Sequence, residues 1–245
     1  SKYIYASLKE VSPMVEIKQD KLDNDEFLLN TPTATYDLRF GVDKKHEHSA
    51  EDYITKQTTI DPSNVGEEIW KAALNTFFCD DKDLIEYVQE VAGLAAIGKV
   101  HLEGLIIAYG GGRNGKSTFL DIIKEICGHE NCTSISFKDL GEKFRVAELY
   151  NKLVSLSGDI SAQPLKDSDL FKQICGGDEI TIERKNAHPF TDTVFATLFF
   201  SANKLPRTPD TTYGFYRKLV IIPFNANLNK VSLVDGAQFH ARLME

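Results

Sequence analysis

The chain has 245 residues, enough for one large domain or for a domain with an appended unit, and we expect the second arrangement. Its formal net charge of −8 argues against a protein that coats duplex DNA through its overall charge. There is no secretory signal, no apolar run long enough for a membrane span and no paired zinc-ligand spacing, so we expect a cytoplasmic protein with buried thiols at Cys79, Cys127, Cys132 and Cys175.

Residues 1–62 predict a small β-rich unit. Extended segments are expected at 14–18 and 34–40, because β-branched and aromatic residues recur there between the turn formers Pro13, Pro32 and Gly41.

A pair of helices is predicted next, within residues 63–98. Capping residues at 61–64 precede two stretches with helical spacing, at 67–78 and 81–97. We interpret the aromatic residues of the first stretch as core, and the pair as a candidate oligomerisation collar.

Residues 110–118 form the most informative motif, because they fit the pattern G-x-x-x-x-G-K-[ST]. The apolar run at 104–109 predicts a buried strand before the motif, and helical spacing at 119–127 predicts a helix after it. In that setting backbone N–H groups surround the phosphates of a nucleotide, Lys116 neutralises the β and γ oxygens, and the Ser117 hydroxyl is a ligand for Mg²⁺. The residues expected to bind ATP are Gly110, Gly111, Gly112, Arg113, Asn114, Gly115, Lys116, Ser117 and Thr118. The motif therefore predicts a nucleoside triphosphatase.

Strands and helices alternate through the rest of the predicted core, residues 99–245. Strands are expected at 131–135, 152–157, 179–184, 194–201 and 219–223, and helices at 139–149 and 168–175. This alternation is typical of a parallel sheet that is covered by helices on both faces.

Three polar residues near the ends of predicted strands are candidate catalytic groups. Asp159 follows the strand at 152–157 and could hold the Mg²⁺ shell and polarise a water molecule. Asn203 follows another strand, at the sheet edge where ligands bind in open α/β folds. Arg217 precedes the last strand and could reach a phosphate in an adjacent subunit. The alternatives are a turn-forming Asp, a turn-forming Asn and a surface Arg.

A basic loop lies between these strands, within residues 182–189. Residues 1–90 carry 19 acidic and 10 basic side chains, and the later residues are close to neutral. In a monomer the loop would be an ordinary solvated turn. Repeated around a ring, it would suit a single-stranded DNA backbone. The candidate DNA-binding residues are Arg184, Lys185, Asn186 and His188.

Taken together, these residues resemble the phage and plasmid primase-helicase family of superfamily III helicases, over about residues 35–225. Four stretches carry the resemblance in order: Gly-Gly-Arg-Asn-Gly-Lys-Ser-Thr at 111–118, and residues 171–178, 200–206 and 214–224. The resemblance implies a P-loop AAA+-type three-layer α/β sandwich with a mainly parallel sheet. It also implies an ATP- and Mg²⁺-dependent homo-oligomer, a hexamer, that moves on single-stranded DNA during replication.

The resemblance also implies roles for single residues. Lys116 and Ser117 would be the triphosphate and Mg²⁺ ligands, with Asp159 as the acid. Asn203 would be the sensor and Arg217 the finger that acts on a neighbouring subunit. The loop at 183–188 would be the hairpin that tracks DNA.

Two residues depart from the family pattern. Gly158 stands where members often have another acid, and Lys218 stands where many have a second arginine. No primase site is recognisable, so we expect a helicase portion with a fused or associated primase domain, or a stand-alone relative, in a bacterial host cytoplasm. Gly158 keeps open a slow-hydrolysing loader or switch. A small-molecule kinase is disfavoured, because no arginine-rich lid segment is present.

Overall fold

The centre of the molecule is a five-stranded sheet. A computed structural model describes residues 2–18, 21–97, 102–160, 165, 167–206 and 208–228, without the side chain of Asp159. All neighbouring strands of the central sheet are parallel, in the order β10-β4-β9-β6-β5. The strands are β4 Leu105–Tyr109, β5 Cys132–Thr133, β6 Val154–Asp159, β9 Thr197–Ala202 and β10 Leu219–Pro223. The expected mixed α/β fold with a parallel sheet is confirmed.

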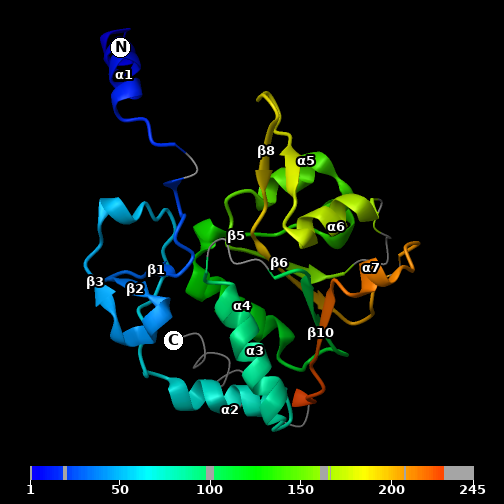
Figure 1. Ribbon diagram of the computed structural model, residues 1–245. Helices are drawn as coiled ribbons and strands as arrows, with labels where there is room; N and C mark the ends of the chain where they lie inside the picture. The colour runs from blue at the N-terminus through cyan, green and yellow to red at the C-terminus, as the bar shows by residue number, and fades with distance from the viewer. Residues whose placement is uncertain are drawn as a thin grey trace.

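Helices cover both faces of this sheet (Figure 1). Alternate residues of β4 belong to two different apolar clusters, with Leu105 and Ile107 in one and Ile106 and Ala108 in the other. Since side chains alternate across a strand, each cluster is the core on one face. One face packs α2 Glu67–Phe77, α3 Lys82–Leu94 and α4 Lys116–Cys127, and the other packs α5 Lys143–Val146, α6 Ser168–Gly176 and α7 Tyr213–Tyr216.

Helices α3 and α6 each begin at a capping carboxylate, whereas α2 begins after Gly66 without a side-chain cap. The Asp81 carboxylate accepts a hydrogen bond from the Leu84 N–H at 3.1 Å and starts α3. The Asp167 carboxylate accepts from the N–H groups of Asp169 and Leu170 and starts α6. Such caps satisfy backbone donors that have no partner in the first helical turn.

The N-terminal unit contains a small antiparallel sheet, in the order β1-β2-β3. Its strands are β1 Leu28–Asn30, β2 Thr35–Asp37 and β3 Lys45–His46, with 3-10 turns at Ser12–Met14, Leu38–Asp43 and Ala50–Asp52. The strand expected at 14–18 is wrong, since no strand is present there. A helix, α1 Lys2–Val11, precedes residues 14–18. It extends away from the body of the molecule and contains no buried residue (Figure 1).

Hydrogen bonds join this unit to the central core. The Thr59 N–H donates to the Ile126 carbonyl at 3.0 Å, and the Asn131 amide donates to the Gln57 carbonyl at 2.9 Å. The Lys56 ammonium donates to the side chain of Asn151 at 2.8 Å. The N-terminal unit therefore rests on the C-terminal end of α4 and on the turn before β5.

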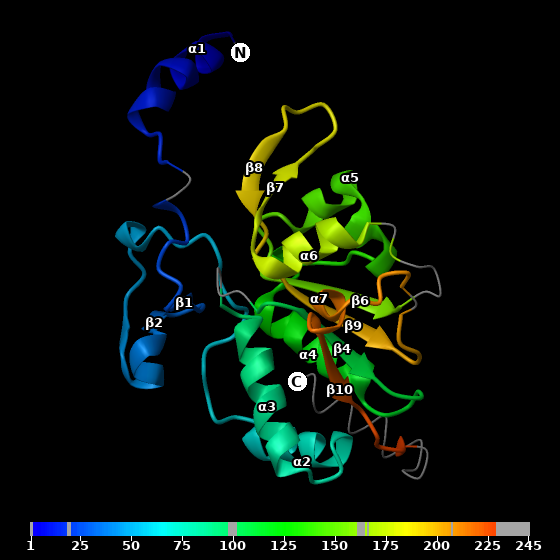
Figure 2. The ribbon, with the colours of Figure 1, turned by 45° about the vertical axis from the view of Figure 1, so that its right-hand side comes forward.

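Strands β7 Glu179–Ile182 and β8 Phe190–Thr193 form an antiparallel hairpin that projects from the body (Figure 2). The single helix expected at 139–149 is instead three short pieces, because Glu142 has an extended backbone between the 3-10 helix Phe137–Gly141 and α5, and the 3-10 helix Ala147–Leu149 follows. A further 3-10 turn at His129–Asn131 precedes β5.

Candidate functional site

The glycine-rich loop lies where β4 ends and α4 begins, at the carboxyl edge of the sheet. The Gly110 N–H donates to the Ala202 carbonyl at 3.0 Å, which ties the loop to β9. A Cβ at Gly110 would lie 2.3 Å from both the Asn114 amide nitrogen and the Phe224 oxygen, so only glycine fits. Gly115 has a φ of +94°, and a Cβ there would lie 2.3 Å from the ring of Phe77.

Lys116 is held at the centre of the loop and is 5% exposed. Its ammonium donates to the Gly110 carbonyl at 2.6 Å, to the Asn114 side-chain oxygen at 3.0 Å and to the Asn203 side-chain oxygen at 3.3 Å. The structure thus brings together Lys116 and Asn203, which are far apart in the sequence. All three of these acceptors are uncharged, so an incoming phosphate would be a stronger partner for the ammonium.

Asn114 connects the loop to the last strand. It is 3% exposed, and its amide nitrogen donates to the Phe224 carbonyl at 2.8 Å while its oxygen accepts from Lys116. Sequence reasoning included Asn114 only as a loop residue and missed the contacts made by Phe77 and Phe224. The motif gives the loop, but nothing local in the sequence pairs it with residue 224.

The other loop residues surround an accessible region. A Cβ at Gly111 or Gly112 would meet nothing within 4 Å. Arg113 is exposed and has a positive φ of 52°, and its carbonyl accepts from the Leu228 N–H at 3.0 Å. Thr118 lies in the first turn of α4 and is half-buried.

A cleft of about 630 Å³ adjoins this loop. Its lining includes Ser117 and Asp121 of α4, Ser157 and Gly158 of β6, and Ser201 of β9. Ser117 is exposed in the first turn of α4, and that turn contains no acidic residue. A helix N-terminus without carboxylates favours an anion through its N–H groups and dipole. These residues fit a nucleotide phosphate chain with its Mg²⁺.

The backbone of β6 brings the predicted acid to the same edge of the sheet. β6 ends at Asp159, and its pairing with β9 shifts between Ser157 and Asp159, so Gly158 is an irregular residue in the strand. A Cβ at Gly158 would meet nothing within 4 Å. The prediction for the Asp159 side chain lies outside what the structure describes.

Arg217 lies at the opposite end of the sheet from its own glycine-rich loop. Leu219 pairs with Leu105 at the start of β10 and β4, and Pro223 pairs with Tyr109 at their end. Four strand steps of about 3.3 Å place at least about 13 Å between Arg217 and the level at which Gly110 begins the loop. Arg217 is exposed. The structure therefore does not bring Arg217 together with Lys116 of the same chain.

Lys218, the second departure from the family pattern, is directed into the protein. It is 4% exposed, and its ammonium contacts the Glu103 carboxylate at 3.1 Å and the Cys175 carbonyl at 3.2 Å. Arg217 and Lys218 are adjacent in the sequence, but the Arg217 side chain is exposed and the Lys218 side chain is buried.

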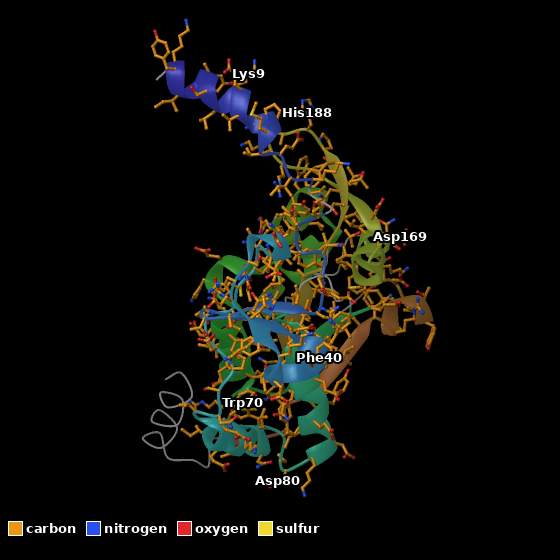
Figure 3. The ribbon with its side chains drawn as sticks, turned by 60° about the vertical axis from the view of Figure 1, so that its left-hand side comes forward. Lys9, Phe40, Trp70, Asp80, Asp169 and His188 are labelled. Carbon is orange, nitrogen blue, oxygen red and sulfur yellow. The ribbon has the colours of Figure 1, made fainter. Side chains whose placement is uncertain are left out.

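The four candidate DNA-binding residues are all exposed on the hairpin. Figure 3 shows His188 near the top of the view, on the side of the molecule from which α1 extends, and far from Trp70 of α2 and from Asp80 in the turn between α2 and α3. Arg184 is at the base of the hairpin tip, with its guanidinium 4.9 Å from the Tyr150 ring centroid and 5.4 Å from that of Phe190. Lys185 and Asn186 follow it, and Asn186 has a positive φ of 62°.

An exposed aromatic residue that the sequence did not single out accompanies the hairpin. Phe144 is 64% exposed, and it lines a shallow groove together with Glu183, Arg184 and Lys185. The short helix α5 presents it beside the hairpin. Phe144 precedes Glu183, Arg184 and Lys185 by 39 or more residues, so no local sequence pattern could have predicted that they lie together.

The cysteines differ in their environment. Cys127 and Cys175 are buried, and burial raises the pKa of each thiol to about 12. Burial also raises the pKa of the partly buried Cys132 to about 11. Cys79 is exposed, which corrects the expectation that all four are buried. Within the described residues, no group of three or more His, Cys, Asp and Glu could hold a metal, and no helix has the length and apolarity that crossing a membrane requires.

Comparison with known proteins gives two family matches. Residues 1–79 match a family described as D5 N terminal like, and residues 108–218 match DUF5906, a family of unknown function. No curated protein sequence gives a significant match.

Solved structures share the fold. Two apo structures of the NrS-1 C terminal region are each 22% identical, with a TM-score of 0.58, over 72% of this chain. The match spans only 42% and 43% of those chains. A structure of JCV helicase with a bound small molecule is 12% identical, over 73% of this chain and 53% of that chain, with a TM-score of 0.45.

The class follows from the fold: the chain is an α/β protein built like the NrS-1 C terminal region. This fold, together with the D5 N terminal like match over residues 1–79, supports the resemblance to the phage primase-helicases that the motifs indicated.

Proposed function

We propose that this protein is an ATP-dependent DNA helicase or translocase of phage- or plasmid-type replication. The observation that carries the proposal is the loop at 110–118, in which Lys116 contacts Asn114 and Asn203 beside an open cleft at the carboxyl edge of a parallel sheet. This is the edge where open α/β folds bind ligands. Lys116 would bind the β and γ oxygens of ATP, and the backbone of residues 110–115 would surround the phosphates.

The cleft residues would position Mg²⁺ and water. The Ser117 hydroxyl would be a Mg²⁺ ligand, and Asp159 would accept hydrogen bonds from the metal's water shell. Mg²⁺, when bound, neutralises charge that develops on the phosphate oxygens. Once Lys116 turns toward a phosphate, the Asn203 oxygen that accepts from it is available to orient the attacking water.

The position of Arg217 supports hydrolysis between subunits. Because this residue is exposed at the far end of β10, it would act on the nucleotide of a neighbouring protomer. Arginine fingers contribute roughly 10³ to 10⁵ in turnover. Head-to-tail contacts of this kind close into a ring when the rotation per subunit permits, and we propose a hexamer.

The hairpin would contact single-stranded DNA inside such a ring. Lys185, Asn186 and His188 are exposed on its tip, and Phe144 offers an exposed ring beside them. Proteins bind single strands without sequence preference by placing cationic side chains near the backbone and aromatic rings against the bases. The Arg184 guanidinium lies over the rings of Tyr150 and Phe190. Its main proposed role is therefore to stabilise the hairpin, and DNA contact is a secondary role. A fused or associated primase domain and a host-cytoplasm location complete the proposal.

Gly158 favours a second candidate function, a slow-hydrolysing loader or switch. This residue lines the cleft where another acid would help to hold the metal shell, and it contributes no side chain. Such a protein would bind ATP and DNA but turn over slowly, whether or not DNA is present.

ATP hydrolysis measured against protein concentration, with and without single-stranded DNA, tests the proposal. Light scattering on the same samples gives the mass. We expect specific activity to rise steeply with concentration, to increase with DNA and to coincide with a hexameric mass. Lys116→Ala is the matched inactive control. DNA-independent slow turnover would select the loader, and turnover that survives Lys116→Ala would refute the ATPase assignment.

A further inference from the structure

An exposed aromatic surface surrounds the proposed finger. Tyr213 is 82% exposed and Tyr216 is 51% exposed, and both belong to α7 immediately before Arg217. Residues three and four apart share one face of a helix, so Tyr213, Tyr216 and Arg217 form a continuous patch, here called the α7 patch. Two tyrosines beside an arginine match the composition of interface hot spots, which are enriched in Tyr, Trp and Arg.

The opposite side of α7 is anchored. Phe215 is fully buried, and its ring centroid lies 5.1 Å from that of Phe171 on α6. Lys218 is buried directly after the patch and contacts Glu103. Packing of Phe215 in the core therefore sets the orientation of the α7 patch. The core contact of α7 is made by Phe215, so the rings of Tyr213 and Tyr216 remain available to a partner.

A network of polar contacts also fixes the start of α7. Thr212 caps the helix, with its hydroxyl accepting from the Phe215 N–H. The Asp210 carboxylate accepts from the Thr212 N–H at 3.0 Å and pairs with the Lys172 ammonium of α6 at 2.6 Å. The hydrogen bond from Lys172 holds the pKa of Asp210 well below its usual range. A preorganised patch loses little conformational entropy when a partner binds.

We propose that the α7 patch docks against the nucleotide cleft of a second copy of this chain, with Tyr213 and Tyr216 as the anchors that place Arg217 there. This inference rests on the proposed function of Arg217. The register of β10 and β4 places the α7 patch at the opposite end of the sheet from the glycine-rich loop, and Ser117 at the end of that loop lines the cleft, so the patch does not reach the cleft of its own chain. That arrangement is what a head-to-tail interface requires.

The cleft offers room for the incoming side chains. It is open to solvent, and Gly158 on its lining leaves empty space where a larger residue would stand. Its exposed Asp121 carboxylate could pair with a tyrosine hydroxyl or with the arginine. Tyrosines bury roughly 150–250 Å² each, so the pair would supply about a third of the ~1,000 Å² that a biological interface needs.

The test compares Tyr213→Ser/Tyr216→Ser with wild type by sedimentation and by ATPase assay. We expect at least tenfold weaker self-association, with ATP affinity at low protein concentration unchanged. Tyr213→Phe/Tyr216→Phe keeps the rings and should associate nearly normally. Phe40→Ser, which removes a 57% exposed ring from the N-terminal unit (Figure 3), is the control for loss of an exposed aromatic residue.

Mixing experiments identify the surface that the patch contacts. The Lys116→Ala protein has an intact patch but an inactive cleft, whereas the double serine variant has an intact cleft and a damaged patch. The mixture should regain ATPase activity, because one subunit supplies what the other lacks. Normal association of the serine variant, or weakened association without rescue in the mixture, would overturn the proposal. A wild-type protein that hydrolyses ATP as a monomer would instead refute the intersubunit function itself.

Discussion

Gly115 provides a strict test of the site geometry, through the substitution Gly115→Ala. The new Cβ would lie 2.3 Å from the Phe77 ring, and the φ of +94° is one that side chains rarely adopt. Unfavourable φ costs about 1–3 kcal/mol, and overpacking costs about the same. The free energy of unfolding should therefore fall by about 2 kcal/mol or more, which lowers Tm by at least about 4 °C for a chain of this size.

Thermal unfolding followed by circular dichroism, without nucleotide, measures this effect. Gly111→Ala is the matched control, because a Cβ there would meet nothing and its φ is not positive. Its Tm should stay within about 2 °C of wild type. Combining Gly115→Ala with Phe77→Ala should cost less than the sum of the single changes, since the second removes the clash. Equal melting of the two alanine variants, or strict additivity in the double variant, would show that Gly115 does not pack against Phe77.

Four further predictions concern the proposed activity. Lys116→Ala should abolish ATP binding or turnover, measured by nucleotide titration and phosphate release, while unfolding remains cooperative. Arg217→Ala should lower turnover about 10³-fold with ATP affinity retained, and mixing it with Lys116→Ala protein should restore part of the activity. Lys185→Ala should weaken single-stranded DNA binding and reduce the log-log salt slope, roughly −4 for six neutralised phosphates, by about 0.7. Arg184→Ala should lower Tm as well as DNA affinity, because the contacts of the guanidinium with the Tyr150 and Phe190 rings are lost. An unchanged Tm would show that Arg184 does not stabilise the hairpin and contributes only to DNA binding.

Much of the central fold could be predicted because its strands are short apolar runs. Residues 105–109, 197–202 and 219–223 form the apolar strands that the sequence indicates, and the motif at 110–118 follows a strand and leads into a helix as expected. The two helices before the core were also predicted, because both have helical apolar spacing and Asp81 caps the second. Local signals and tertiary packing point the same way in these segments.

Elsewhere the local signals were missed or were overridden. Residues 2–11 form a helix that was not predicted, although Ile4, Leu8 and Val11 have helical spacing. Residues 137–149 have helical composition but break into three pieces, since Phe137, Leu140, Val146 and Leu149 all have to reach the same apolar cluster. Burial of these four side chains in one core therefore outweighs the helix propensity of the segment.

The candidate site shows a similar division. The identity of Lys116 and Asn203 could be read from strand ends and motif spacing, but their 3.3 Å contact depends on β4 and β9 being neighbours, which spacing does not give. Arg184 illustrates the opposite case. Its charge and its place in a turn predict a DNA contact, and only the structure shows the rings of Tyr150 and Phe190 beneath it.

Strand β10 connects the two nucleotide sites that one protomer would serve. At its start, Arg217 would reach the cleft of a neighbour, while just beyond its end the Phe224 carbonyl accepts from Asn114, which in turn contacts Lys116. In the proposed mechanism β10 would couple the two sites, because Phe224, which contacts Asn114 of one site, and Arg217, proposed to act on the next, lie just beyond its two ends.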